Sequence, residues 1–371
     1  MAQKILNTNG EYSILDSWFK QANCCLLVCG KSITRLKIND YLDEIPSRLG
    51  VKIFRFMDFQ PNPLYESVIE GTRIFREKQC DAIIAIGGGS AIDVAKCIKL
   101  YSNLSGNGEA GSWLNMTIVP NEIPFLVMPT TAGTGSESTK YAVIYYKGNK
   151  QSVTSESFIP ETILMDSSVL KTLPLYHKKA TMMDALSHAI ESFWSVNSTE
   201  VSKEYSKTAI KNVLKHIDGY LSNTEDGNSG MLMAAHLAGQ AINITQTTAG
   251  HAMCYKITSL FGTAHGHAAI LCNRILFEWM IDNTEKCIDP RGENYLKETF
   301  NEIGLALGCN NGKEGAAKLK TVFKKLELQI PMASANHYEE LTASVDPSRL
   351  KNHPIQLTPD IITELYHKIL R

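Results

Sequence analysis

The segment ATMMDALSHAIESFW (180–194) carries a carboxylate and an imidazole in an otherwise apolar run. Asp184 and His188 lie four residues apart, and Glu191 follows three residues later. On a helix this spacing places the three side chains on one face. A polar stripe facing solvent would explain an isolated pair of this kind. The same side chains are also suited to binding a divalent metal ion.

A second segment, TTAGHAMCYKITSLFGTAHGHAAILCN, adds three histidines among small and apolar residues: His251, His265 and His267. On one straight helix, His251 and His265 would be about 21 Å apart, too far to share an ion bound at about 2 Å per ligand. Gly262 and Gly266 supply a break that would let the chain fold back. One carboxylate together with three imidazoles suits Fe²⁺, Zn²⁺ or Mn²⁺.

The stretch IAIGGGSAIDVAK (84–96) places glycines where an apolar strand is expected to end and a helix to begin. Without a Cβ atom, Gly87, Gly88 and Gly89 let a ligand approach the backbone closely. The free amides at the start of the helix favour an anion such as a pyrophosphate. The same sequence is equally suited to a tight strand-to-helix turn in which Ser90 is the N-cap of the helix.

The stretch VMPTTAGTGSEST (127–139) repeats this pattern after another apolar strand. Its glycines are combined with four hydroxyl groups, those of Thr130, Thr131, Thr134 and Ser136. Two such loops after two strands of one sheet form a crevice at the carboxyl ends of the strands, where open α/β sheets bind ligands. The two loops together therefore predict a nucleotide site.

The end of the first predicted strand bears on the choice of cofactor. A carboxylate commonly pairs with the ribose hydroxyls of NAD at the end of a strand. Here Gly30 and Lys31 occupy that place. A 2′-phosphate would not be repelled, so we expect NADP to be accepted as well as NAD.

The elements that must position these groups divide the chain into two halves. In the first half, helical patterns alternate with apolar runs at 24–30, 52–56, 80–89, 124–131 and 162–166. Such runs, without alternating polarity, are typical of a parallel sheet covered on both faces. The segment 141–155 differs, because two β-like runs flank Gly148 and Asn149 and predict a hairpin.

Beyond Pro174, helical periodicity dominates and no strand pattern is found. We therefore predict an α/β fold with two domains. Residues 1–174 form a Rossmann-like parallel-sheet domain that binds a dinucleotide. Residues 175–371 form an all-helical, metal-binding domain, with the metal and the cofactor in the cleft between the two.

Composition excludes several classes of protein. The 371 residues carry a formal net charge of −1, and no run approaches about eighteen apolar residues, so neither nucleic acid nor a membrane is an expected partner. The nine cysteines fit neither a zinc ribbon nor a disulfide framework, and the amino terminus has no signal-peptide pattern. We expect a cytoplasmic protein.

Together these motifs resemble the iron-containing (group III) alcohol dehydrogenases. The likeness rests on Asp184-x-x-x-His188, on His251 and His265, and on the GGGSAIDVAK and PTTAGTGSE loops. It implies NAD or NADP, one divalent ion (Fe²⁺, with Zn²⁺ as the alternative) and a homodimer. Carried over by position, the implied metal ligands are Asp184, His188, His251 and His265. The implied cofactor contacts are Asn62, Gly88, Gly89, Ser90, Asp93, Thr130, Thr131, Thr134 and Lys150.

Two departures from the common pattern of the family indicate a subgroup within it. Tyr255 stands where many members carry a further histidine, and His267 follows the last ligand. The run AGHAMCYKITSLFGTAHGHA resembles the phosphonoacetaldehyde reductase subgroup, which implies reduction of phosphonoacetaldehyde to 2-hydroxyethylphosphonate. An anionic aldehyde needs cationic or donor groups near the metal, and the candidates are Lys140, Tyr255 and Lys256. The proton would come from His267 or from water.

Three alternatives remain open at this point. The chain could be an alcohol or polyol dehydrogenase of the same family with a neutral substrate. It could also be a lyase similar to dehydroquinate synthase, or a non-catalytic metal-binding regulator, although a regulator would not need two phosphate-type loops.

Overall fold

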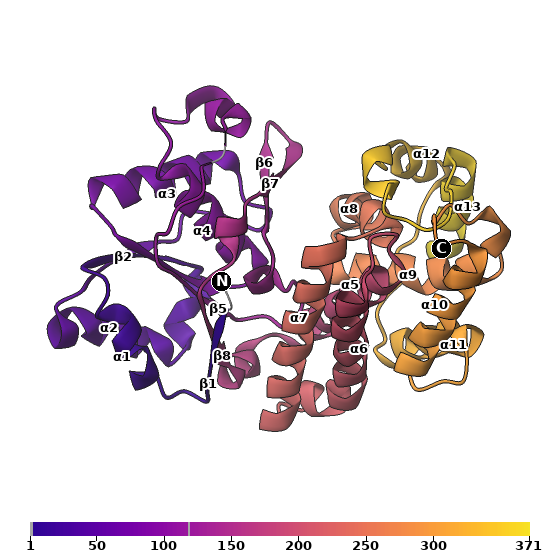
Figure 1. The fold of residues 1–371 in the computed structure, drawn as a ribbon, viewed down its shortest axis with the longest axis horizontal. Helices are drawn as coiled ribbons and strands as arrows, with labels where there is room; N and C mark the ends of the chain where they lie inside the picture. The colour runs from indigo at the N-terminus through magenta and orange to yellow at the C-terminus, as the bar shows by residue number, and fades with distance from the viewer. Residues whose placement is uncertain (1–2, 118) are drawn as a thin grey trace. The chain divides into compact units, whose positions relative to one another are not determined.

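The computed structural model describes residues 3–117 and 119–371. The chain forms two compact units. The first unit comprises the chain up to Thr131 together with Ser136–Leu173. The second unit comprises Ala132–Gly135 and Pro174–Arg371. In Figure 1 the first unit runs from indigo to magenta, and the helices of the second follow in the later colours.

The first unit is built on a six-stranded parallel sheet with strand order β1-β8-β5-β4-β2-β3. The strands are β1 (Lys4–Thr8), β2 (Cys24–Cys29), β3 (Lys52–Phe56), β4 (Ala82–Gly87), β5 (Phe125–Pro129) and β8 (Thr162–Asp166). Five of them confirm the predicted apolar runs. Strand β1 was not predicted, because KILNT is short, ends in polar residues and pairs only with β8 at the sheet edge.

Burial explains why these runs form strands covered on both faces. Every residue of β2 is buried. Helices α3 (Tyr65–Glu77) and α4 (Gly89–Tyr101) lie on one face of the sheet, and α1 (Asp16–Phe19) and α2 (Ile38–Leu49) lie on the other (Figure 1). The predicted hairpin is confirmed as β6 (Tyr141–Tyr146) and β7 (Asn149–Thr154), joined through Lys147 and Gly148, which both have positive φ.

The second unit is helical, as predicted. Its helices are α5 (Leu175–Trp194), α6 (Glu200–Leu221), α7 (Glu225–Thr245), α8 (Ala249–Phe261), α9 (His265–Ile281), α10 (Glu293–Ala306), α11 (Gly312–Lys325), α12 (Ala335–Ala343) and α13 (Pro359–Ile369). Helix α5 packs against α6, α7 and α9, and every residue from Met182 to Trp194 is buried. None of the helices among the described residues is long and apolar enough to cross a bilayer.

Two glycine positions determine how α8 and α9 are arranged. Gly262 has φ of 64° and ends α8, so the predicted break between His251 and His265 is present. The expectation that Gly266 also breaks the helix is wrong. Gly266 lies inside α9, where a Cβ atom would approach the Ala180 carbonyl oxygen on α5 to 2.2 Å. Its role is therefore close packing of α9 against α5.

The segment Ala132–Gly135 of the second glycine loop also packs closely against helices through its glycines, and it belongs to the helical unit. A Cβ atom on Gly133 would lie 2.6 Å from the Thr181 carbonyl oxygen on α5. A Cβ atom on Gly135 would lie 2.5 Å from the Cα of Gly239 on α7. Both positions therefore exclude any larger side chain without movement of the backbone.

Candidate metal centre and nucleotide-binding loops

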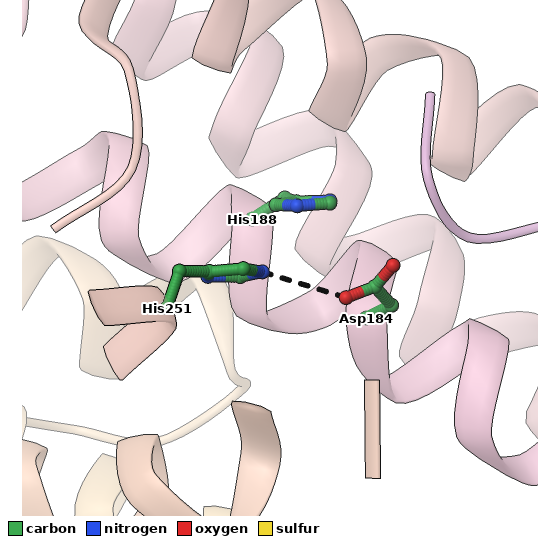
Figure 2. A group of neighbouring side chains, drawn as sticks. All are labelled: Asp184, His188 and His251. Atoms are coloured by element: carbon green, nitrogen blue, oxygen red, sulfur yellow. Dashed lines mark hydrogen bonds and ion pairs between the residues drawn. The ribbon is translucent and has the colours of Figure 1, made fainter. Parts of the chain in front are cut away.

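Three of the four predicted metal ligands form a buried cluster. Asp184 and His188 come from α5 and His251 comes from α8, and Figure 2 shows the two imidazole rings stacked beside the carboxylate. One possible ligand atom of each lies within 4.8 Å of the others. Each residue is at most 6% exposed, which excludes a solvent-facing stripe. One carboxylate and two imidazoles, close together and buried, are a donor set that fits a divalent ion.

The cluster includes a carboxylate whose role the sequence did not reveal. Glu191 is fully buried and accepts a hydrogen bond from His251 Nδ1 at 2.6 Å. It also accepts bonds from the Thr248 amide at 2.7 Å, the Thr248 hydroxyl at 2.8 Å and Asn273 Nδ2 at 2.7 Å. Because Glu191 accepts the Nδ1 proton of His251, the other ring nitrogen, Nε2, is the one that faces Asp184, 3.4 Å away, and is left for an ion. Glu191 thus fixes the tautomer that a metal ligand needs.

The charges of the cluster depend on one another. Burial opposes ionisation of Asp184, but the adjacent histidines outweigh burial and hold the pKa of Asp184 well below its usual range. Burial also opposes ionisation of Glu191, but the charge and hydrogen bond of His251 lower the pKa of Glu191 to about 2. Burial lowers the pKa of His188 to about 4, so this imidazole is neutral near pH 7, as a metal ligand must be.

The pKa of His251 moves in the opposite direction. Burial alone would lower it, but the carboxylates of Glu191 and Asp184 outweigh burial and raise the pKa of His251 to about 9. In the absence of a metal ion, His251 therefore carries a proton at neutral pH. A cation at this place would displace that proton.

The fourth predicted ligand lies next to the cluster. The His265 ring centroid is 5.2 Å from that of His251, and His265 Nδ1 lies 3.6 Å from the sulfur of Cys254. Tyr255, predicted to contact substrate, stacks on His265 with ring centroids 5.3 Å apart. His265 is outside the group of three whose ligand atoms lie within 4.8 Å of one another, so its ligation stays a prediction.

His267, predicted as a proton donor, has different neighbours. Residues two positions apart on a helix point about 200° apart, so His267 leaves α9 on the side opposite to His265. Its Nδ1 lies 3.1 Å from the Tyr176 hydroxyl, which accepts a bond from the Ala264 amide. Together with Tyr176 and Phe261 it lines a cavity of about 600 Å³. The role of His267 as the proton donor stays a prediction.

The first glycine loop lies beside the start of the second, and both of these parts belong to the first unit. Gly87 ends β4, and Gly88 is the N-cap residue of α4. The Thr130 amide, at the end of β5, donates to the Gly87 carbonyl at 2.9 Å. A Cβ atom on Gly88 would lie 3.3 Å from the Thr131 side chain. The structure therefore brings the two predicted phosphate loops together at one edge of the sheet.

The strand order adds an independent argument for a nucleotide site. After β2 the chain forms β3 on one side of that strand and β4 on the other, so the order reverses between β2 and β4. Open α/β sheets bind ligands beyond the carboxyl ends of the strands at such a switch point. Gly30 and the exposed Lys31 follow β2 there, and the Gly87–Ser90 loop follows β4. Asn62, in the connection after β3, has φ of 57°.

Asp93 is engaged by the protein itself. One of its carboxylate oxygens accepts from the Ser136 hydroxyl at 2.6 Å, and the other accepts from the Val143 amide at 3.0 Å. Lys96, one turn further along α4, is fully buried and donates to the carbonyls of Ser136, Thr139 and Tyr141 at 2.6, 2.7 and 2.8 Å. Burial lowers the pKa of Lys96 to about 8. The first loop's helix thus holds the second loop in place.

The remaining predicted site residues are spread over both units. Lys150 lies in β7, and its charge favours ionisation of Asp93. Thr134 lies in the Ala132–Gly135 segment. The two lysines predicted to bind substrate have carboxylate partners, since Lys140 pairs with Glu156 at 2.9 Å and Lys256 pairs with Glu340 at 2.6 Å.

A buried carboxylate–imidazole cluster in a helical unit, together with paired glycine loops on a parallel sheet, is typical of an enzyme that uses a divalent ion and a nucleotide. The family comparison makes this class specific. The family described as iron-containing alcohol dehydrogenase matches residues 2–167, and its C-terminal counterpart matches residues 178–370. The chain belongs to the iron-containing alcohol dehydrogenase family and is an NAD(P)-dependent alcohol dehydrogenase. The lyase and regulator alternatives are therefore set aside.

Individual relatives agree with this assignment. The chain is 28% identical over 309 residues to alcohol dehydrogenase 4 of Schizosaccharomyces pombe, covering 82% of this chain and 71% of that one. It is 32% identical over 230 residues to the NAD-dependent methanol dehydrogenase of Bacillus methanolicus, covering 61% of this chain and 59% of that one.

Solved structures share the fold. A sulfoacetaldehyde reductase from Bifidobacterium kashiwanohense, in complex with NAD⁺, superposes with a TM-score of 0.87 at 23% identity, covering 99% of this chain and 96% of that one. An iron-containing alcohol dehydrogenase from Thermococcus thioreducens gives 0.88 at 21% identity, with 99% and 98% covered.

Proposed function

We propose that Asp184, His188 and His251, with His265 as the fourth ligand, hold the divalent ion of this dehydrogenase. The observation that carries the proposal is the buried cluster in which Glu191 fixes the tautomer of His251. The family implies a divalent metal, typically iron, and the donor set is equally suited to Zn²⁺.

We further propose that the dinucleotide lies along the Gly87–Ser90 loop, with its pyrophosphate at the amino end of α4. Free amides at a helix start attract phosphate, and the Thr130 and Thr131 hydroxyls follow the adjacent strand β5. Lys31 is placed to attract a 2′-phosphate, so NADPH should serve at least as well as NADH. Asp93 contributes through Ser136, whose hydroxyl it fixes.

The residues of the chain perform three tasks in this scheme. When bound, the metal ion supplies Lewis acidity and the nicotinamide supplies hydride. Asp184 and the neutral imidazoles leave the site with net positive charge for a developing alkoxide. Glu191 holds the Nδ1 proton of His251, so that Nε2, directed into the cluster, is the nitrogen left for the ion once its own proton is displaced. Burial of the cluster excludes water, which strengthens each of these electrostatic interactions.

For the substrate, we propose phosphonoacetaldehyde, on the support of the AGHAMCYKITSLFGTAHGHA run. The sulfoacetaldehyde reductase with the same fold is named for another short aldehyde bearing an anionic group. A neutral substrate is the second candidate, because Lys140 and Lys256 both have carboxylate partners. The NADPH-dependent butanol dehydrogenase of Clostridium saccharobutylicum, 26% identical over 336 residues (88% of this chain and 84% of that one), is named for such a substrate.

The test is an assay of aldehyde reduction after reconstitution with Fe²⁺ or Zn²⁺. Phosphonoacetaldehyde and butyraldehyde would each be measured with NADH and with NADPH. We expect turnover only with metal, use of NADPH, and a higher kcat/KM for phosphonoacetaldehyde. Full activity and full metal content in His265→Ala would remove His265 from the ligand set. A cytoplasmic location and a homodimer remain predictions of the sequence.

A further inference from the structure

A cation that sequence analysis did not single out lies beside the candidate metal centre. Arg349 belongs to η8 (Pro347–Leu350), a single 3₁₀ turn of the helical unit. Its Cζ lies 5.3 Å from the centroid of the Tyr255 ring. Tyr255 in turn stacks on His265, with ring centroids 5.3 Å apart and planes inclined by 23°. Tyr255 thus contacts both the guanidinium of Arg349 and the ring of a candidate metal ligand.

Among the described residues, the guanidinium of Arg349 forms no ion pair, although its charge, after the hydrogen bonds from Ser348, lowers the pKa of the nearby Asp346. Within residues 3–117 and 119–371, no carboxylate oxygen lies within 4.0 Å of its nitrogens, the limit for an ion pair. Asp346, three residues earlier, uses its carboxylate to accept from the Ser348 amide at 2.8 Å and so caps the turn. Lys256, one residue from Tyr255, is by contrast paired with Glu340. Arg349 is therefore a cation beside Tyr255 that, in the part of the chain the structure describes, is not held in an ion pair.

The chemistry of the contact between Arg349 and Tyr255 selects a type of ligand. An aromatic ring beneath a guanidinium occupies one face and leaves the in-plane N–H donors free. These donors form a planar fork that matches two oxygens of a carboxylate or tetrahedral oxyanion. Arg349 and His265 both lie 5.3 Å from the centre of the Tyr255 ring. A substrate whose carbonyl lies at the metal centre must therefore be short for its charged end to reach the guanidinium.

We propose that Arg349 binds the anionic end of the substrate, and that the substrate class is a short aldehyde with a terminal phosphonate or sulfonate. This inference rests on the proposed function, because it places the reacting carbonyl at the metal centre. Phosphonate and sulfonate both present oxygens on a tetrahedral centre to the N–H donors of the guanidinium. Because they differ in charge, binding and activity measurements can distinguish them. A neutral aldehyde of the same length leaves Arg349 without a partner.

The first test compares kcat/KM for phosphonoacetaldehyde, sulfoacetaldehyde and propionaldehyde in four proteins. These are the wild type, Arg349→Gln, Arg349→Lys and Lys351→Gln. Arg349→Gln should lower kcat/KM for the anionic aldehydes by about ten- to a hundredfold and leave propionaldehyde unchanged. Arg349→Lys should recover part of the loss. Lys351→Gln, which removes the same charge from an exposed position two residues away, should behave as wild type.

The second test does not depend on turnover. Binding of ethylphosphonate and ethanesulfonate to the metal-free protein would be measured by calorimetry, with metal content and thermal unfolding checked for each variant. Arg349→Gln should weaken binding of the preferred anion by the same factor as it lowers kcat/KM. If Arg349→Gln does not fold, Arg349→Lys decides, because loss of the fork should still weaken binding several-fold. The anion bound more tightly by the wild type identifies the substrate.

The outcomes separate this inference from the proposed function. A wild type that neither binds NAD(P)H nor reduces any aldehyde would overturn the proposed function. A wild type that reduces propionaldehyde but disfavours both anionic aldehydes would overturn the inference and the proposed substrate, and leave the metal- and NAD(P)-dependent dehydrogenase activity standing. Retention of the anionic preference in Arg349→Gln would place the anion at another residue and also overturn it.

Discussion

Replacing Glu191 by Gln tests whether this carboxylate controls the metal centre. One carboxylate oxygen accepts from His251 Nδ1 and Asn273 Nδ2, and the other accepts from the Thr248 amide and hydroxyl. Glutamine has the same shape but replaces one acceptor oxygen by an NH₂ donor. In either orientation of the glutamine side chain, its NH₂ group faces two hydrogen-bond donors and can accept from neither.

The two orientations fail in different ways. With the NH₂ group toward Thr248, the hydroxyl can rotate but the backbone amide loses its acceptor in the protein interior, at a cost of about 1–3 kcal/mol. With the NH₂ group toward His251, the imidazole must accept at Nδ1 and carry its proton on Nε2. That tautomer has no lone pair facing Asp184 and cannot bind the ion from that nitrogen.

We therefore expect Glu191→Gln to weaken metal binding by about 10- to 100-fold. It should also lower the free energy of unfolding of the metal-free protein by about 1–3 kcal/mol. Competition with a chromophoric chelator measures the first quantity and urea denaturation the second. Glu204→Gln, at an exposed position on α6, is the control. Metal affinity within twofold of the control, with unchanged stability, would refute the assigned role of Glu191.

Two further predictions follow from the buried charges. Metal affinity should fall about tenfold for each pH unit as the pH is lowered from 9 to 7, because the ion must displace the proton on His251. The pKa of His251 in the metal-free protein is raised to about 9. A metal affinity that does not change with pH in chelator competition would contradict this prediction. Lys96→Met should lower the free energy of unfolding by about 3 kcal/mol, since three carbonyls lose a buried donor. Lys99→Met on the same helix frees only the Asn121 carbonyl and should cost about 1 kcal/mol, so equal losses in urea denaturation would count against the assigned role of Lys96.

Much of the fold could be predicted because its elements are defined by local patterns. The buried strands β2, β4 and β5 are apolar runs without alternation, which are typical of a sheet covered on both faces. The i, i+4 spacing of Asp184 and His188 needs only a helix to bring the side chains together. This spacing accounts for two of the three residues of the buried cluster, and the third, His251, was expected from the histidine-rich segment that forms α8.

The rest depends on contacts between distant parts of the chain. Glu191 lies on the stripe of Asp184, but its function depends on Thr248 and Asn273, which the fold alone brings near. Arg349 lies in a polar stretch with no periodicity, far in sequence from Tyr255, over whose ring its guanidinium lies. The choice of lysines as substrate contacts overlooked the acids that pair with them, because an ion pair between distant residues leaves no local signal.

The short excursion of Ala132–Gly135 into the helical unit affects how the protein can be divided. The chain passes between units after Thr131, after Gly135 and after Leu173. A protein truncated after Leu173 would keep the glycines of the excursion but lose Thr181 and Gly239, on which they pack. The complementary fragment would keep those surfaces without the glycines. Neither half is therefore an interchangeable module, and shuffling of domains at the Leu173–Pro174 junction would transplant an incomplete unit.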